Sequence, residues 1–339
     1  IIHQERPSAK STGVNAIHSD EHGRAEIDHD KVLSCVMCLV SCPFSAIVDK
    51  GQIFRTILAM KTGTPVYAIV APAVAGQFGP DMKPEKIRPA FQALGFEDVI
   101  EVAVGADLCT IEEAKDFMKE VPEELPFMAT SCCPAWSMMA KKLFPEQAKC
   151  ISMALTPMVL TARLIKQQNP DCKIVFVGPC AAKKLEASRK TIRSYVDFVL
   201  TFEELQGMFD AKGVDFKELP DGEPLMQASA DGRGFASSGG VASAVVNAIR
   251  RMEPNREVKV VSAEGLANCK KMLQLAKAGK YNGYLLEGMA CPGGCIAGAG
   301  TIQPIKKTAA SLEQMKKQAP FEESMDTVYD AMLPILEKL

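Results

Sequence analysis

The sequence of 339 residues lacks several features that would assign it to a common class. It has no run of about 18 apolar residues, so no segment is expected to cross a membrane. Its formal net charge is only -2 and no Lys/Arg cluster is present, which argues against nucleic-acid binding. The first ten residues are mostly polar and contain no signal-peptide core. We therefore expect a cytoplasmic protein. Because it has no initiator Met, we interpret the chain as a fragment of a longer protein.

Cysteine, in contrast, is abundant, with 12 residues in the chain. Secreted proteins with disulfides are usually short and carry an export signal, so metal or redox chemistry is the better interpretation here. Buried free thiols are the simpler interpretation for the scattered cysteines. These are Cys109, Cys150, Cys172 and Cys269.

The hydrophobic pattern predicts an α/β fold with two or more lobes. Strands alternate with helices, and the segment between Pro65 and Val70 is typical of a buried strand. Further strands are predicted at 99–104, 127–130, 173–178, 258–262 and 281–287, and helices at 84–94, 110–119, 240–251 and 322–339. In parallel sheets, ligands bind at the carboxyl ends of the strands. The clustered cysteines lie at such ends.

Three segments carry these clustered cysteines. They are residues 130–136 with Cys132 and Cys133, residues 178–184 with Cys180, and residues 287–295 with Cys291 and Cys295. Four thiolates gathered from three strand ends form a complete ligand set for a [4Fe–4S] cluster. Zinc also accepts four thiolates, but structural zinc sites usually use short knuckles. An iron–sulfur cluster is therefore the leading interpretation.

The three segments resemble, in content and order, the signature motifs of the [FeFe]-hydrogenase family, across about residues 57–300. The resemblance implies a two-lobed catalytic domain of parallel or mixed sheets flanked by helices. Such domains interconvert 2 H⁺, 2 e⁻ and H₂ at the six-iron H-cluster, a [4Fe–4S] cubane bridged to a two-iron subsite with carbonyl, cyanide and a dithiolate amine. By motif position the cubane ligands are Cys133, Cys180, Cys291 and Cys295, and Cys295 is the bridge.

The same resemblance implies a proton path. Cys132 would exchange protons with the bridging amine, a task suited to a thiol because its pKa is tunable. Glu113, Ser152 and Asp116 would continue the path, since a hydroxyl between two carboxylates can both donate and accept. Glu113 and Asp116 are three residues apart and share a helix face. A packed core thiol and ordinary polar side chains are the simpler interpretations.

Four more residues are expected to line the H-cluster by resemblance. Lys183 would donate a charge-assisted hydrogen bond to a cyanide ligand. Pro72 and Ala73 would face the second cyanide through their backbone. Met289 would pack against the two-iron subsite. The simpler interpretations are a surface lysine and a core-filling methionine.

The N-terminal segment departs from the ferredoxin pattern that it resembles. The bacterial run C-x2-C-x2-C-x3-C-P is present here as Val32, Cys35, Cys38 and Cys42, so the first ligand is a residue that cannot bind iron. A short internal repeat places Ser8 opposite Cys38 and Thr12 opposite Cys42. Neither ligand set is complete. We predict a small α+β ferredoxin-like segment without a normal pair of [4Fe–4S] clusters; a single cluster with a non-cysteine ligand is the alternative.

Two domains follow from these patterns. Residues 1–57 would form the ferredoxin-like segment and residues 58–339 the catalytic domain, with lobes at about 58–170 and 171–339. Gly178 replaces the usual Met, and Ala73 replaces a common Ser, which indicates a divergent subgroup.

The expected partners are a ferredoxin or another redox protein, and the maturation proteins that install the two-iron subsite. An iron–sulfur assembly or scaffold protein and a slow H₂ sensor are the competing functions. The retained Cys132, Glu113 and Lys183 favour a hydrogenase, because a scaffold needs no proton relay.

Overall fold

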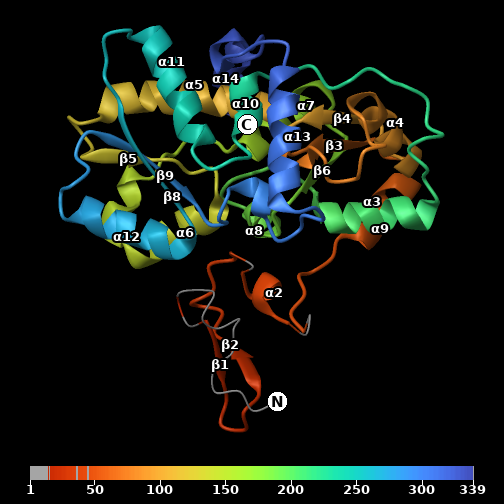
Figure 1. Cartoon of the computed structure of the whole chain (residues 1–339), viewed down its shortest axis with the longest axis horizontal. Coiled ribbons are helices and arrows are strands. Elements are labelled where there is room, and N and C mark those ends of the chain that lie inside the picture. Colours follow the sequence, from red (N-terminus) through yellow and green to blue (C-terminus); the bar gives the residue numbers. More distant parts are fainter. Residues whose placement is uncertain (1–13, 15, 36, 44–45, 339) are drawn as a thin grey trace.

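The computed structural model describes most of the chain. The described residues are 14, 16–35, 37–43 and 46–338. Ser8 and Thr12, which the internal repeat singles out, lie outside them. The described N-terminal part is a small α+β unit that projects from the main body (Figure 1). It contains an antiparallel hairpin and a short helix, which are β1 (Ile17–Ser19), β2 (Ala25–Ile27) and α2 (Met37–Ser41).

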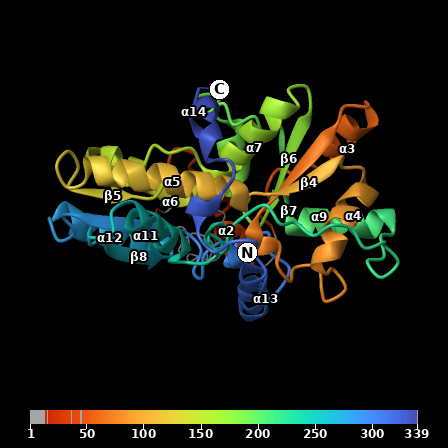
Figure 2. The same ribbon diagram turned by 90° about the horizontal axis from the view of Figure 1, so that it is seen from above.

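The main body is an α/β structure with two separate parallel sheets. The first sheet has the order β4-β3-β6-β7 and the second the order β5-β9-β8. The strands are β3 (Val66–Val70), β4 (Asp98–Glu101), β5 (Phe127–Ala129), β6 (Lys173–Gly178), β7 (Phe198–Thr201), β8 (Lys259–Glu264) and β9 (Tyr284–Met289). One buried apolar cluster packs around each sheet. From above, the two halves lie at opposite ends of an elongated body (Figure 2).

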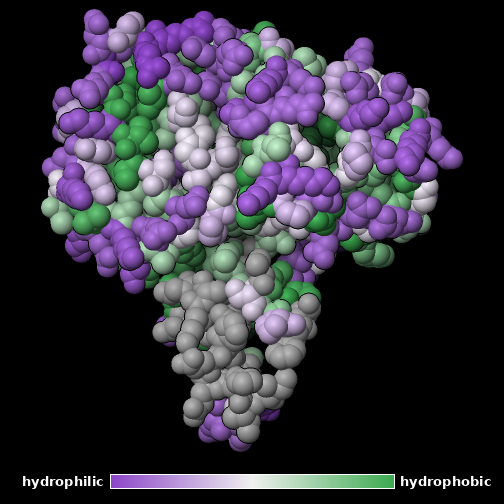
Figure 3. All heavy atoms as spheres, viewed as in Figure 1, coloured by the Kyte–Doolittle hydropathy of each residue, from purple (hydrophilic) through white to green (hydrophobic). Residues whose placement is uncertain are grey.

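Helices cover both sheets. The longer ones are α3 (Ile53–Lys61), α4 (Pro84–Leu94), α5 (Ala103–Glu120), α6 (Pro134–Leu143), α7 (Pro157–Gln168), α9 (Phe202–Lys212), α11 (Gly240–Met252), α12 (Leu266–Lys277) and α13 (Ile305–Lys317). The shorter ones are α8 (Ala182–Ser188), α10 (Ala230–Gly234) and α14 (Leu333–Leu336). The 3₁₀ turns are η1 (Pro72–Val74), η2 (Pro145–Cys150), η3 (Cys295–Ala297), η4 (Ser324–Asp326) and η5 (Asp330–Met332). Among the helices described, none is long and apolar enough to cross a membrane. Hydrophilic side chains cover most of the face in Figure 3.

Elements with strong local signals match the predictions. Helix α4 begins at Pro84 and ends at Gly95, which has a left-handed φ of 107°. Proline is compatible with the first helical turn, and glycine takes the left-handed conformation without steric cost. Strand β6 coincides with the predicted strand at 173–178, because a run of buried branched residues leaves little ambiguity.

The bounds of two neighbouring predicted elements are wrong. The strand expected at 99–104 ends at Glu101, and the helix expected from Thr110 begins at Ala103. The first half of α5 is buried on all sides between its neighbours, so it lacks the polar face that marks a helix.

The expected helix at 322–339 is broken into η4, η5 and α14. One reason is Pro334, which lies in the first turn of α14; proline has no backbone N–H and is incompatible with a helix interior. Arg163 Nη1 donates to the carbonyls of Leu336 at 2.6 Å and Glu337 at 3.3 Å, which lack intrahelical donors at the end of the segment.

The sheets do not follow the expected division into lobes at residue 170. Strands β3 and β4 precede it, yet they share a sheet with β6 and β7. Strand β5 also precedes it, yet pairs with β9, with Phe127 opposite Tyr284. Each half of the body is therefore built from distant parts of the chain.

Candidate active site

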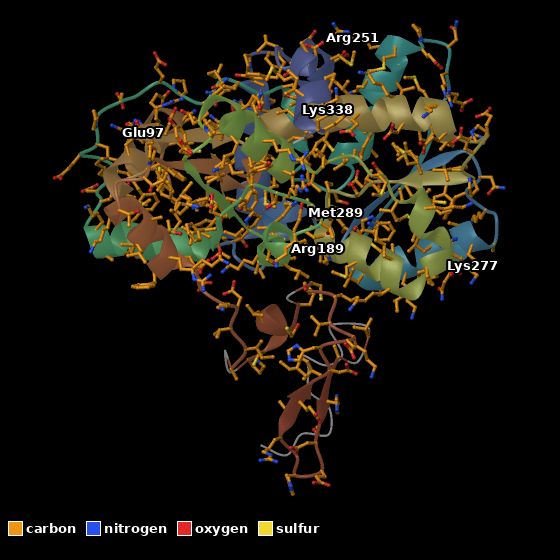
Figure 4. The ribbon with its side chains drawn as sticks, turned by 180° about the vertical axis from the view of Figure 1, so that it is seen from behind. Glu97, Arg189, Arg251, Lys277, Met289 and Lys338 are labelled. Atoms are coloured by element: carbon orange, nitrogen blue, oxygen red, sulfur yellow. The ribbon has the colours of Figure 1, made fainter. Side chains whose placement is uncertain are left out.

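Residues from all three cysteine-rich segments line one cavity. Each segment directly follows a strand: β5, β6 or β9. Met289, at the end of β9, lies near the centre of the main body (Figure 4). The cysteines that line the cavity are Cys35, Cys132, Cys133, Cys180, Cys291 and Cys295. Strand ends from both sheets thus converge on one space.

Packing of Trp136 shapes the loop that carries Cys132 and Cys133. Cys133 is the N-cap of α6, and the fully buried Trp136 donates from Nε1 to the carbonyl of Thr130 at 2.9 Å. The facing residue is Gly288, where a Cβ would come within 2.2 Å of the Trp136 ring. Glycine is therefore required for the indole to lie against β9. Both cysteine-bearing segments are positioned by this one contact.

The electrostatics of the thiols fit a cationic cofactor. Burial, followed by the charges of nearby thiols, raises the pKa of Cys180 to about 11 and that of Cys295 to about 12. The pKa of Cys291 is also raised, first by burial and then by Cys180, Cys133 and Cys295. Four thiolates this close repel one another unless positive charge lies between them, and an iron–sulfur cluster supplies that charge. Within the described residues, no three His, Cys, Asp or Glu side chains are grouped tightly enough to hold a single metal ion.

Lys183 lines the same cavity from α8. Its Nζ lies 3.2 Å from the backbone oxygen of Cys132, to which it donates, and 2.7 Å from Oε2 of Glu186. Burial is the largest single influence and lowers the pKa of Lys183, but the charge and hydrogen bonding of Glu186, together with Cys180 and Cys132, leave the pKa raised. The side chain is therefore an ammonium in the cavity wall and not a surface lysine.

Glu113 lies behind the Cys132 loop. It is fully buried, and its Oε1 accepts from the Ser131 N–H at 3.4 Å, while Oε2 has no hydrogen-bond partner among the described residues. Burial raises its pKa to about 8, and the approaching Ser152 side chain opposes this only in part. Burial likewise raises the pKa of the Cys132 thiol, with Glu113 as the next cause. The structure thus brings Cys132, Glu113 and Ser152 together.

Asp116 is arranged differently from the expectation. Its charged neighbours are Glu120, Lys119 and Glu337, and no described hydrogen bond joins it to Ser152. The half-buried Glu112 instead lies within electrostatic range of both Asp116 and Glu113, and burial raises its pKa to about 7. The sequence analysis passed over Glu112, because adjacent carboxylates on a helix give no signal of which one turns inward.

The remaining predicted residues also line the cavity. Pro72 and Ala73 lie in η1 after β3, and Met289 is the last residue of β9. Phe176 is an addition that the sequence analysis missed. A Cβ on Gly178 would come within 2.6 Å of its ring. The ring occupies the space that a larger residue at position 178 would need, and it forms part of the cavity wall.

The N-terminal segment reaches the cavity through the buried Cys35, which also lies close enough to raise the pKa of Cys291. Cys38 lies within electrostatic range of Cys35 and Cys42. Lys142 on α6 fastens this segment by donating to two of its backbone carbonyls, at 2.7 and 3.0 Å. Cys35 therefore lies against the main body, which its ferredoxin-like spacing did not predict.

Comparison with known proteins identifies the family. Residues 64–299 match the family model described as "Iron only hydrogenase large subunit, C-terminal domain". The match covers well over half of the chain, so the chain belongs to the iron-only hydrogenase family. A solved [FeFe]-hydrogenase studied for oxygen inactivation has the same fold, with a TM-score of 0.70 at 22% identity over 84% of this chain and 95% of that one.

Curated relatives fall into two groups. The chain is 28% identical to the NADP-reducing hydrogenase subunit HndD of Solidesulfovibrio fructosivorans, over 87% of this chain and 61% of that protein. It is 31% identical to the periplasmic [Fe] hydrogenase large subunit of Nitratidesulfovibrio vulgaris, over 65% of this chain and 62% of that protein. The chain thus spans about three fifths of the length of these relatives. It is also 26% identical to the cytosolic iron-sulfur assembly component 3 of Bos taurus, over 86% of this chain and 78% of that protein.

Proposed function

We propose that the chain is an [FeFe]-hydrogenase that interconverts 2 H⁺, 2 e⁻ and H₂ at an H-cluster. The observation that carries the proposal is the shared cavity, in which five motif cysteines and Lys183 meet from three separate strand ends. In this proposal a ferredoxin or another redox protein exchanges electrons with the chain in the cytoplasm, and maturation proteins install the two-iron subsite.

Four thiolates would hold the cofactor: Cys133, Cys180, Cys291 and Cys295, with Cys295 as the bridge between cubane and two-iron subsite. The donor set fits, because mutual repulsion among these buried thiolates is relieved by a cationic cluster. When bound, the H-cluster supplies redox-active iron and a basic amine beside it.

Cys132 and Glu113 are proposed to move protons. Both hold their protons at neutral pH, since burial raises the pKa of each. In this proposal a proton leaves the Cys132 thiol for Glu113 as Glu113 releases its own proton to the Ser152 hydroxyl, so neither group carries a buried charge at rest. The Ser152 hydroxyl can accept and donate in turn, and Glu112 and Asp116 would continue toward the surface.

The other cavity residues would hold and shield the cofactor. The Lys183 ammonium can donate a charge-assisted hydrogen bond to an anionic ligand of the two-iron subsite. Pro72, Ala73 and Met289 contribute apolar walls that exclude water, which strengthens such electrostatic contacts.

An iron–sulfur assembly role is the second candidate, and the similarity to assembly proteins such as that of Bos taurus favours it. Such a protein needs the cubane ligands but neither a proton-carrying thiol nor a buried proton acceptor. Cys132 beside the buried Glu113 therefore supports the hydrogenase proposal.

Metal loading followed by infrared spectroscopy and an H₂ assay tests the proposal. The full chain is reconstituted with iron and sulfide, then with the two-iron subsite. We expect carbonyl and cyanide stretches, and H₂ evolution with a strong reductant. Cys132→Ser should keep the stretches and lose most of the turnover, while Cys150→Ser, a buried cysteine away from the cavity lining, should leave both unchanged. A cubane without these stretches would favour the assembly role, and about twelve or more irons per chain would contradict the degenerate N-terminal segment.

A further inference from the structure

Glu186 is a buried carboxylate beside the cavity to which the proposed function gives no role. It lies on α8, one turn after Lys183, and its side chain is 3% exposed. Oε2 is 2.7 Å from Lys183 Nζ, and Oε1 accepts a hydrogen bond from the Thr156 hydroxyl. A charge this far from water is costly unless it is paired and hydrogen-bonded. Oε1 has the Thr156 hydrogen bond, whereas Oε2 has no hydrogen bond among the described residues and depends on the Lys183 ion pair.

Lys183 is shared between two acceptors on different segments. Its Nζ donates to the Cys132 carbonyl at 3.2 Å while it pairs with Glu186. Lys183 and Cys132 line the cavity, whereas Glu186 lies behind the lysine and outside the lining. Glu186 can therefore reach a bound cofactor only through Lys183.

Thr156 joins a third segment to this arrangement. It is the N-cap residue of α7 and precedes Pro157 and Met158, both of which line the cavity. Through Glu186 the start of α7 is tied to α8, and through Lys183 helix α8 is tied to the loop after β5. One carboxylate thus connects three segments of the cavity wall.

We infer that Glu186 is a positioning residue, which holds the Lys183 ammonium in the cavity wall, anchored on the Cys132 carbonyl and facing an anionic ligand of the cofactor. The nature of that ligand rests on the proposed function, but the anchoring does not. A lysine has a flexible four-carbon stem and a single point charge, so its direction depends on fixed partners. Without the carboxylate, Lys183 keeps only the Cys132 carbonyl among its described acceptors.

The adjacent lysine provides a matched control. Lys184 is equally buried, with a side chain 10% exposed, and it pairs with Asp49 at 2.6 Å and Glu204 at 2.9 Å. It does not line the cavity. Asp49→Asn therefore removes a carboxylate from a buried lysine pair without touching the cavity, as Glu186→Gln does within it.

The first experiment measures hydrogen–deuterium exchange by mass spectrometry in the full chain without the two-iron subsite. Glu186→Gln keeps the size of the side chain and an acceptor for Thr156 but removes the charge. We expect the peptide spanning residues 130–136 to exchange severalfold faster in Glu186→Gln, and at the wild-type rate in Asp49→Asn. Equal exchange in wild type and Glu186→Gln would overturn the anchoring role.

The second experiment records infrared spectra after loading the two-iron subsite. Glu186→Gln and Lys183→Met should shift the cyanide bands in the same direction, and the double variant should match Lys183→Met alone. A further shift in the double variant would mean that Glu186 acts through α7, which overturns the inference. Missing carbonyl and cyanide bands in every variant, wild type included, would refute the proposed function while the exchange result still decides the anchoring.

A milder variant covers the case in which Glu186→Gln does not fold. Thr156→Val removes one hydrogen bond from Glu186 and leaves its charge in place. It should accelerate exchange of the 130–136 peptide to a smaller degree and shift the cyanide bands in the same direction. Wild-type behaviour in both measurements would count against the inference.

Discussion

Replacing Glu113 by Gln tests whether Glu113 holds a proton in the folded chain, independently of the other residues of the proposed proton path. In the folded chain Glu113 is fully buried and holds its proton up to a pKa of about 8, because burial disfavours the charged form more than Ser152 and Ser131 favour it. Glutamine has nearly the same shape and cannot ionise, so it mimics the protonated acid permanently. The variant should be close to wild type in stability only below about pH 4.5, where folded and unfolded wild-type chains both carry the proton, and more stable than wild type above it.

The direction and size of the Glu113 contribution to the free energy of unfolding follow from the shift in its pKa. The folded pKa lies above the unfolded value of 4.5, so the folded chain binds the proton more tightly. The resulting stability is fully present below the unfolded pKa and is lost as the pH rises through the folded pKa. The loss is about 1.4 kcal/mol per pH unit for one proton, which gives about 2.5 kcal/mol between roughly pH 6 and pH 9. Glu113→Gln should not show this part of the loss.

Urea unfolding of the full chain without cofactor measures the effect at several pH values. Other buried carboxyl groups, such as Asp107 with a pKa of about 7, contribute equally to wild type and variant and cancel in the comparison. Glu123→Gln changes an exposed carboxylate on the loop after α5 and should follow the wild-type curve. If the free energies of unfolding of wild type and Glu113→Gln change in parallel with pH, the reasoning is refuted, because Glu113 would then not hold a buried proton.

Three further changes test the packing around the cavity. Trp136→Phe leaves the buried carbonyl of Thr130 without its donor and should cost about 1–3 kcal/mol in a denaturant titration; an unchanged midpoint would contradict the contact. Gly178→Ala places a Cβ 2.6 Å from the Phe176 ring and should cost about 1–3 kcal/mol, whereas a stabilised variant would mean that the ring is free to move. Lys142→Met removes two hydrogen bonds to the N-terminal segment and should speed its cleavage in limited proteolysis, with Lys115→Met, at an exposed position on α5, as the unaffected control.

The pattern of hydrophobic and turn residues predicts many of the elements but not all of them. Helix α4 carries proline at its start and glycine at its end, so its limits are local properties. Helix α5 is buried on most faces. The apolar sequence at its start is also typical of a buried strand, and only its packing against neighbouring elements distinguishes the two. The helix expected at 322–339 is wrong because the prediction passed over Pro334, which is compatible only with the first turn of a helix.

The sequence alone predicted the cysteines of the candidate site. Cysteines at fixed spacings after strands, with Lys183 close behind Cys180, specify donor chemistry whatever the surroundings. Tertiary structure decided what spacing cannot encode. It brought Cys35 into the cavity, placed Phe176 beside Gly178, and set Glu186 behind Lys183. These contacts join residues through packing and burial, which depend on the whole chain and not on any local pattern.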